Sequence, residues 1–464
     1  MSVTAKIRMY NQQDLGDCFL LNFSNSKGEE AYYLIDFGSY KNGNDVRENE
    51  IARHIAETIG DKKLTIILTH QHKDHLSGFK STGDVLKGDK KNNRSLWLSF
   101  LDDKDGDEGK VIRAVTEKYW KKNKKATELI NQKFAHSAAI MGMLEEKKVY
   151  DLFAEEQSGG EAMTALLNIC ENNVTFLKPG HNFLLPGLSE GVRVYVLGPP
   201  TKESQLRKLD PHKHEGVEGL TAMMELSNLD ISNSLMLDAL EGISADAQNA
   251  PYKEINFPFS LNFVDNTADN PITQAYHDSK EVNRQIEDEW LSEIGRMALH
   301  MDRLTNNTSL VLAFELVESK KVLLFVGDAQ IGNWQSWFDV TFHDSPVTAK
   351  DLLSRTVLYK AGHHSSHNAT LKDGLNLMNE NELIIMVPVD AKSAKPFKML
   401  KPEMLTGYNR KSKGKVLRSD TIVQNGKGLV TPYPFVTSTG LGNLKIIPDG
   451  TANGHLALEI EIKG

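Results

Sequence analysis

Short apolar runs, separated by glycine, asparagine and charged residues, recur towards both ends of the chain. Runs of this length, bounded by turn-forming residues, are typical of β-strands. They predict strands at 7–10, 18–23, 31–35, 64–68, 95–100, 174–177, 192–197, 309–315, 321–326, 356–360 and 383–389. Only a short turn separates the strands at 309–315 and 321–326, so this pair is expected to form a β-hairpin.

Two long segments interrupt the strand pattern. Residues 80–170 are rich in Lys, Glu, Ala and Leu over most of their length and are expected to form a helical insertion. Residues 201–303 are expected to form an acidic insertion of loop and helix. Within it, residues 210–302 carry 18 acidic and 5 basic side chains.

Two apolar patterns are interpreted as helix packing rather than as binding sites. Residues 281–304 place an apolar stripe from Ile286 to Met301 at helical spacing, which favours a helix that faces a core. Trp334 and Trp337 are likewise expected to pack a helix onto a sheet, and not to line a pocket.

Composition narrows the class of protein. The chain has 464 residues, 40% of them hydrophobic and 25% charged, which excludes collagen-like, fully disordered and disulfide-rich proteins. No run approaches the roughly 20 apolar residues of a membrane span, and the first residues do not resemble a secretory signal. The two cysteines, Cys18 and Cys170, fit a reducing compartment. We therefore expect a cytoplasmic protein with a single domain, 1–464, that carries the two insertions.

The strongest chemical signal follows directly after the expected strand 64–68. His70, His72, Asp74 and His75 fall within six residues of one loop. Neutral imidazole is a good ligand for zinc, iron or manganese, and a carboxylate adds charge compensation. His70 and His72 can share one metal ion, while Asp74 and His75 turn towards a second.

Two later strands end in residues of the same kind. Gly327-Asp328 follows the strand 321–326, and Gly362-His363-His364 follows the strand 356–360. A carboxylate at the end of an apolar strand is costly unless it is paired or ligated. A single Gly-Asp is more often a turn, but together with the first loop these segments predict a metal site.

These motifs resemble those of the metallo-β-lactamase superfamily, and more narrowly those of its ComEC-like branch. The resemblance rests on His-x-His-x-Asp-His at 70–75 and on the Gly-Asp and Gly-His pairs after the later strands. Further matching segments lie at 15–20, 34–38, 306–312 and 363–366. The resemblance covers roughly 1–80, 174–200 and 304–390, and it excludes both insertions and the far C-terminal part.

The resemblance implies a four-layered αβ/βα sandwich, of mixed α+β and α/β class, with two divalent metal ions, zinc or manganese, at the edge between its sheets. It assigns His70 and His72 to the first metal. It assigns Asp74, His75 and His363 to the second metal, with Asp328 bridging both.

One expected ligand of the first metal is missing. Many members of the superfamily supply a third histidine from a strand end, where this chain has Gly198. His181, His212 and His214 lie nearby in the sequence, but none follows an apolar strand, so they are interpreted as surface residues. The first site is therefore expected to be weak or empty, and occupancy by a single metal stays open.

The implied activity is hydrolysis by a metal-bound hydroxide. Asp74 would orient the hydroxide, and His364 or His367 would stabilise the oxyanion or protonate the leaving group. Asp17 and Asp36 lie at turns near the same edge and are interpreted mainly as residues that fix the loops.

Local charge indicates the class of substrate. The net charge of −8 argues against a polyanion, but residues 391–418 hold nine basic side chains and one acidic one. Candidate substrate-binding residues in this basic strip are Lys395, Lys398, Lys401, Arg410, Lys411, Lys413 and Lys415. A basic strip beside a di-metal site favours a phosphodiesterase or nuclease, with nucleic acid as a candidate substrate. A solvated loop, or pairing with the acidic insertion, stays equally open.

Two alternative functions remain. The first is hydrolysis of another ester or amide, such as a phosphocholine ester or a lactone. The second is a metal-stabilised binding or assembly module of a multicomponent system, in which the insertions dock a protein partner. The missing third histidine supports the second alternative. No membrane partner is expected.

Overall fold

The computed structural model describes most of the strands and helices expected from the sequence. The described residues are 2–40, 45–88, 93–114, 117, 121, 160–212, 214–217, 304–397, 399–424, 428–430, 443–451 and 454–464. Contacts along the chain define two compact units, of which the first contains 1–114, 155–223 and 303–464. The second unit, 115–154 and 224–302, lies almost entirely outside the described residues, as do most of both expected insertions and the helix expected at 281–304. The division into a single domain with two insertions stays a prediction.

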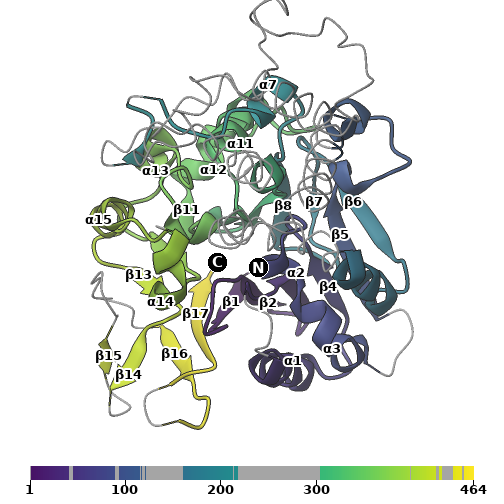
Figure 1. Ribbon diagram of the computed structural model, residues 1–464, viewed down its shortest axis with the longest axis vertical. Helices are drawn as coiled ribbons and strands as arrows, with labels where there is room; N and C mark the ends of the chain where they lie inside the picture. The colour runs from purple at the N-terminus through teal and green to yellow at the C-terminus, as the bar shows by residue number, and fades with distance from the viewer. Residues whose placement is uncertain are drawn as a thin grey trace, which may run out of the picture. The chain divides into compact units, whose positions relative to one another are not determined.

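An eight-stranded mixed sheet, sheet A, contains the first strands of the chain and its last. Its order is β16 (Leu444–Ile447), β17 (Ala457–Lys463), β1 (Val3–Tyr10), β2 (Cys18–Asn25), β3 (Glu30–Phe37), β4 (Leu64–Ile67), β5 (Arg94–Ser99) and β6 (Val174–Leu177). Neighbouring strands are antiparallel from β16 to β3 and parallel from β3 to β6. Figure 1 shows β17 beside β1, although they come from opposite ends of the chain.

A seven-stranded mixed sheet, sheet B, is built from later segments. Its order is β13 (Val416–Arg418), β12 (Ile384–Val387), β11 (Thr356–Lys360), β10 (Lys321–Phe325), β9 (Val311–Leu316), β8 (Val192–Gly198) and β7 (Asn182–Leu184). The strands from β7 to β10 are antiparallel, and those from β10 to β13 are parallel. The predicted hairpin is confirmed as β9 and β10. A separate antiparallel pair joins β14 (Ile422–Gln424) and β15 (Gly428–Val430).

Helices pack against each sheet and share buried side-chain clusters with it. α1 (Asp45–Ile59), α3 (Gly78–Lys87) and the helical residues 160–169 share a buried cluster with sheet A. α11 (Ile331–Ser336), α12 (Ala349–Ser354), α13 (Lys372–Leu377) and α15 (Pro402–Lys411) share one with sheet B. The remaining short helices are α2 (Lys73–Leu76), η1 (Phe100–Asp102), α7 (Glu203–Leu206), η5 (Trp337–Asp339), η6 (His363–Ser365), α14 (Ala391–Ala394) and η7 (Lys395–Phe397).

A third buried cluster contains side chains from both sheets. In it, Phe325 of β10 contacts Phe19 of β2 edge-on, with ring centroids 5.6 Å apart, and Phe314 of β9 at 5.9 Å. The chain is therefore a mixed α/β protein with two mixed sheets and helices. Its three clusters, one shared by the sheets and one on the helical side of each, are consistent with the predicted αβ/βα order of layers.

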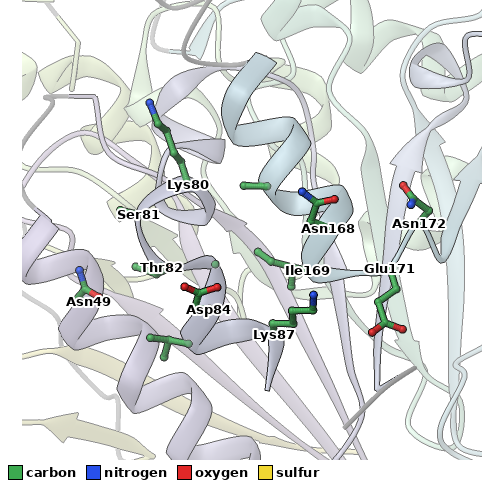
Figure 2. A pocket seen from close by; sticks show the side chains of 13 residues that line it. Asn49, Lys80, Ser81, Thr82, Asp84, Lys87, Asn168, Ile169, Glu171 and Asn172 are labelled. Carbon is green, nitrogen blue, oxygen red and sulfur yellow. The ribbon is translucent and has the colours of Figure 1, made fainter. Parts of the chain in front are cut away.

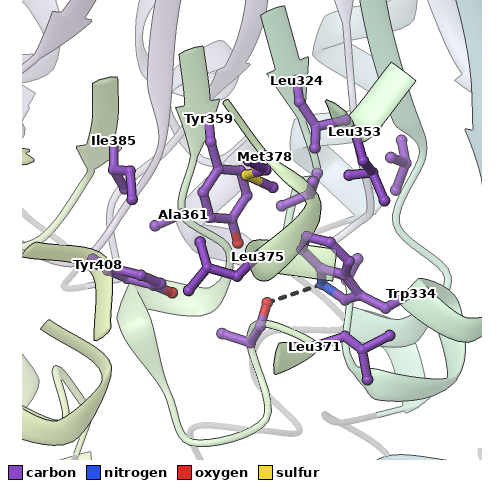
Figure 3. Packing of buried hydrophobic residues seen from close by; sticks show 14 of the residues in the cluster. Leu324, Trp334, Leu353, Tyr359, Ala361, Leu371, Leu375, Met378, Ile385 and Tyr408 are labelled. Atoms are coloured by element: carbon purple, nitrogen blue, oxygen red, sulfur yellow. Dashed lines mark hydrogen bonds between the residues drawn. The ribbon is translucent and has the colours of Figure 1, made fainter. Parts of the chain in front are cut away.

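Packing of helices onto sheet B explains the two tryptophans. Both are fully buried, and their rings lie 4.0 Å apart between centroids. Trp334 also donates from Nε1 to the carbonyl of Ala369 (3.0 Å) and packs near Tyr359 of β11 (Figure 3). The interpretation of Trp334 and Trp337 as packing residues is confirmed. Among the described residues, no helix combines the length and apolar character that crossing a membrane would require.

Candidate metal centre

Loops from both sheets meet at one edge of the molecule. The histidine loop follows β4 of sheet A, while Asp328 and His363 follow the parallel strands β10 and β11 of sheet B. Parallel neighbours bring their carboxyl ends to the same edge, so these two loops are adjacent. The backbone of Leu310 donates to the carbonyl of Thr69 (2.8 Å) and joins the two sheets beside the histidine loop.

Four side chains form the first group that could hold a metal ion. These are Asp74, His75, Asp328 and His364, whose donor atoms all lie within 4.8 Å of one another. His75 Nε2 lies 3.4 Å from Asp328 Oδ2 and 3.7 Å from Asp74 Oδ2, and His364 Nε2 lies 2.9 Å from Asp74 Oδ2. Asp74 is the least buried member, and the other three are buried. Two imidazoles and two carboxylates can together bind a divalent cation.

A second group shares His75 with the first and adds Asp17 and Asp36. Asp36 accepts hydrogen bonds from the backbone and hydroxyl of Thr69 (2.8 and 2.7 Å) and from His75 Nδ1 (2.8 Å). Asp36 therefore fixes the loop, as its place in the sequence suggested, and also orients His75. The buried Nε2 of His75 has no hydrogen-bond partner among the described residues. It faces the carboxylates of the first group.

The ionisation of these residues reflects how closely opposite charges are held. Burial alone would lower the pKa of His75, but the carboxylates of Asp328 and Asp74 raise it well above its usual range. Burial alone would raise the pKa of each of these two carboxyl groups, but His75 lowers both. His75 and the carboxylates of Asp74 and Asp328 are therefore charged when no metal is bound. A metal ion would replace the proton on Nε2 of His75.

Lys360, the last residue of β11, was not anticipated as part of the site. It is buried, forms an ion pair with Asp17, and donates to Asp328 Oδ1 (3.2 Å) and to the carbonyl of Gly327 (2.6 Å). Burial would lower its pKa, but Asp17 and Asp328 raise it, so the ammonium stays charged. The signal in the sequence was a lysine that ends an otherwise apolar strand, because a buried ammonium requires carboxylate partners.

The first two histidines of the loop also approach each other. His70 Nε2 lies 3.0 Å from His72 Nδ1, and His72 Nδ1 lies 3.0 Å from Asn306 Oδ1. Burial, together with the neighbouring His75 and His72, lowers the pKa of His70 well below its usual range. His70 is therefore a neutral imidazole, the form that binds metals.

The tandem histidines after β11 point in different directions. His364 donates from Nδ1 to the carbonyl of Pro388 (2.7 Å) and joins the first group. His363, which the resemblance assigned to the second metal, instead has Nε2 3.4 Å from Asn306 Nδ2, and its Nδ1 lacks a partner among the described residues. His363, His364 and Ser365 all have positive φ, at 43°, 46° and 62°. Consecutive residues in this region are strained and persist only where their surroundings hold them.

His367 lies apart from both groups. Its Nε2 is 2.9 Å from Asp210 Oδ1, and both side chains are partly exposed. The role suggested for His367 in protonating a leaving group stays a prediction that the geometry does not favour.

The basic strip divides into two parts. Its first part adjoins the site, because the backbones of Leu400 and Lys401 donate to the carbonyls of His364 and Ser365 (both 3.1 Å). The side chains of Lys411, Lys413 and Lys415 instead contact Asn376 and Asn381. Asn376 lies in α13 and Asn381 in the loop before β12, at the opposite end of the parallel strands from the histidines. Arg410 lies in the last turn of α15, Lys395 begins η7, and Lys398 lies outside the described residues.

A surface hollow of about 720 Å³ lies elsewhere, between α3 and the helical residues 160–169 (Figure 2). Polar side chains line much of it, including Lys80, Asp84 and Asn168. None of the predicted site residues lines this hollow, so it is distinct from the candidate metal centre.

Two observations indicate that the residues at this edge suit a divalent cation. Two buried imidazole nitrogens, His75 Nε2 and His363 Nδ1, have no hydrogen-bond partner among the described residues. The carboxylates of Asp17, Asp36, Asp74 and Asp328 also lie close together there, and three of them are fully buried. No model of a protein family, no curated protein and no solved structure matches the chain. The buried histidine and aspartate groups could therefore bind metal, while the family stays a prediction.

Proposed function

We propose that this edge binds divalent metal ions and that the chain is a metal-dependent hydrolase acting on phosphodiesters. The observation that carries the proposal is the arrangement around His75. Its Nδ1 hydrogen is donated to Asp36, so its buried Nε2, which has no hydrogen-bond partner in the described part of the chain, points towards Asp74 and Asp328. Metal-binding histidines commonly donate their second ring nitrogen to a carboxylate in this way, because the bond fixes the tautomer and the ring orientation.

The fold supports the same proposal. A metallo-β-lactamase-type sandwich would have two mixed sheets facing each other, helices outside them, and a metal site at one edge. The three buried clusters and the position of the histidine loop agree with that order. Because many chemistries use one fold, the fold alone does not identify the substrate.

The residues around the site prepare it for hydrolysis. Bound divalent ions would lower the pKa of a water molecule towards neutrality and stabilise negative charge on the reacting group. Asp74 is held in place by His364, which is itself anchored to the carbonyl of Pro388. Lys360 offsets part of the negative charge of Asp17 and Asp328. Rigid support of this kind keeps reacting groups in position.

A phosphodiester is favoured by the part of the basic strip that adjoins the site. The backbone of Lys401 donates to Ser365, in the same loop as the two histidines. A cationic segment next to a metal site can hold the phosphates that flank the reacting one. The more distant lysines of the strip, which contact Asn376 and Asn381, do not contribute to this argument.

Metal content and a substrate panel test the proposal. The purified chain is equilibrated with Mn²⁺ or Zn²⁺, its bound metal is measured by mass spectrometry, and hydrolysis is assayed. The panel contains bis-nitrophenyl phosphate, single-stranded and double-stranded DNA, RNA, a phosphocholine ester and a lactone. Asp74→Ala is expected to lower turnover about 10³-fold without changing the far-UV circular dichroism. The exposed Asp339, which pairs with Lys202, provides the control Asp339→Asn.

The outcomes separate the alternatives. A wild-type chain that binds neither metal contradicts the proposal. Hydrolysis of the lactone or the phosphocholine ester alone would indicate another ester as the substrate. Metal binding without hydrolysis of any member of the panel would favour the metal-stabilised binding module.

A further inference from the structure

The third ligand of the first metal cannot come from the end of β8, where a histidine was expected. A Cβ atom added to Gly198 would lie 2.3 Å from Asn333 Oδ1 and 2.9 Å from a methyl group of Val311. Asn333 cannot move away easily, because its side chain donates to the carbonyls of Asn307 and Ser309 and accepts from Trp337 Nε1. Any side chain at position 198 is therefore excluded by close packing.

Asn306 occupies the space beside the first two histidines instead. It is buried, and its Oδ1 lies 3.0 Å from His72 Nδ1, which in turn lies 3.0 Å from His70 Nε2. Ligands bound at about 2.0–2.2 Å around one metal ion lie roughly 3 Å from one another. His72 Nδ1 therefore already lies at the spacing of a neighbouring ligand from each of the other two donor atoms.

The local hydrogen bonds orient His70 and Asn306 towards His72. His70 Nδ1 lies 3.1 Å from Thr69 Oγ1, whose own hydrogen is donated to Asp36. The hydroxyl can accept the Nδ1 hydrogen, which leaves the lone pair of His70 Nε2 directed at His72. On the other side, Asn306 Nδ2 faces His363 Nε2 at 3.4 Å, and this contact turns Oδ1 towards His72.

The backbone that carries Asn306 is held firmly. The next residue, Asn307, donates from Nδ2 to the carbonyls of Gln205 and Leu206 (3.1 and 2.7 Å). Its Oδ1 accepts from the backbones of Gln330 and Asn333 (3.2 and 3.0 Å). A donor atom on such an anchored turn is pre-positioned, so little ordering is needed when a metal binds.

We propose that the amide oxygen of Asn306 is the third protein ligand of the first metal, completing a His70–His72–Asn306 site. This inference rests on the proposed function, because it assumes that the edge binds metal. Exchange of an imidazole for an amide oxygen makes the ligand set harder, and it shifts preference from Zn²⁺ towards Mn²⁺. The first site is then complete rather than defective, with its preference shifted towards manganese.

Metal titrations of the full-length chain test this ligand. Mn²⁺ binding to wild type, Asn306→Ala, Asn306→Asp and the distant control Asn443→Ala is measured by isothermal titration calorimetry and by electron paramagnetic resonance. We expect two Mn²⁺ sites in wild type and in the control. Asn306→Ala should lose one site or weaken it at least about 10-fold, as expected for loss of one ligand. Asn306→Asp, which keeps an oxygen ligand, should retain both.

A second substitution tests selectivity. Asn306→His should raise the Zn²⁺ affinity of the first site relative to its Mn²⁺ affinity by about 10-fold, measured by competition between the two ions.

If Asn306→Ala leaves the number of Mn²⁺ ions and their dissociation constants unchanged, the assignment of Asn306 is wrong and the proposed function survives. If wild type itself binds no metal, both proposals fail. Should Asn306→Ala not fold, an Asn306→His variant with unchanged metal preference overturns the assignment.

Discussion

A buried lysine among buried carboxylates distinguishes this site at the scale of single residues. Lys360 pairs with Asp17 and Asp328, while Asp36 is occupied with Thr69 and His75. Each group is enclosed in protein, where an unpaired charge is far more costly than in water. The ammonium therefore stabilises the site before any metal binds.

Removal of the Lys360 charge should destabilise the protein. Lys360→Met leaves Asp17 and Asp328 buried without their ammonium, so we expect a loss of about 3 kcal/mol in the free energy of unfolding. Urea denaturation in EDTA measures the loss without a contribution from bound metal. Lys413→Met removes an exposed lysine that pairs with Glu380, and its effect should stay below about 1 kcal/mol. Equal effects of the two substitutions would contradict the buried ion pair.

The sequence identified which residues form the site better than it identified which of them belong to the same metal-binding group. His70, His72, Asp74, His75 and Asp328 were expected from density and position, and all lie at one edge. The orientation of the histidines after β11 depends on three residues with positive φ. Such backbone strain is imposed by tertiary contacts and leaves no local pattern, so His364 could not be distinguished from its neighbour.

At the scale of elements, the turn before β9 organises much of the site edge. Through Asn307 it connects the segment at 205–208 with the start of α11. The Asn307 side chain takes part in five hydrogen bonds, three donated and two accepted, which hold the helical turn 304–307 against both segments. Buried backbone groups in such loops need partners of this kind.

Asn307→Ala should loosen this turn. Several buried backbone groups would lose their partners, and we expect a decrease of about 3 kcal/mol in the free energy of unfolding. Hydrogen exchange at the amides of Gln330 and Asn333 should accelerate in the variant. The exposed Asn381, which accepts from Lys413, provides the control Asn381→Ala, which should alter neither quantity. Unchanged exchange at both amides in Asn307→Ala would refute this role.

The basic strip yields a prediction about which of its elements matters. If the part near the histidine loop contacts the substrate, Lys395→Ala combined with Lys401→Ala should raise KM for a nucleic-acid substrate about 10-fold. The effect should shrink at high salt. Lys411→Ala combined with Lys413→Ala, at the other end of the strands, should leave KM unchanged. Equal effects of the two pairs would show that position along the strip is unimportant.

Strands were predicted well where an apolar run was long enough to stand out. Each of the eleven expected runs contains a strand of sheet A or sheet B. The sequence did not predict β7, β13, β16 or β17 of these two sheets. The first two have only three residues, and β17 alternates apolar with charged residues in a segment for which no motif was recognised. Long-range pairing, rather than local pattern, determines their place.

At the scale of the whole molecule, a buried histidine links the C-terminal part to α1. His455 is buried, and its carbonyl accepts from Arg47 Nη2 (2.6 Å). Nη1 of the same guanidinium pairs with Asp449. Burial, reinforced by Arg47, lowers the pKa of His455 from 6.5 to about 4. The imidazole is therefore neutral in the folded protein across the physiological range of pH.

His455 should make the protein sensitive to acid. Its pKa is lower in the folded than in the unfolded chain, so the unfolded chain takes up the proton first as pH falls. The free energy of unfolding should decrease from about pH 6.5 to about pH 4 by up to about 3 kcal/mol from this group. Urea denaturation at pH 7.5 and 5 should show a smaller decrease for His455→Gln than for wild type. Equal decreases would contradict the assignment.

The pairing of β17 with β1 has a consequence for synthesis of the chain. Strand β1 is synthesised long before β17, yet one of its edges bonds to residues up to Lys463. An unpaired strand edge can pair with other chains, so this edge needs protection while the intervening residues are made. Sheet A is complete only after β17 has been made, and until then the nascent protein exposes this edge of β1.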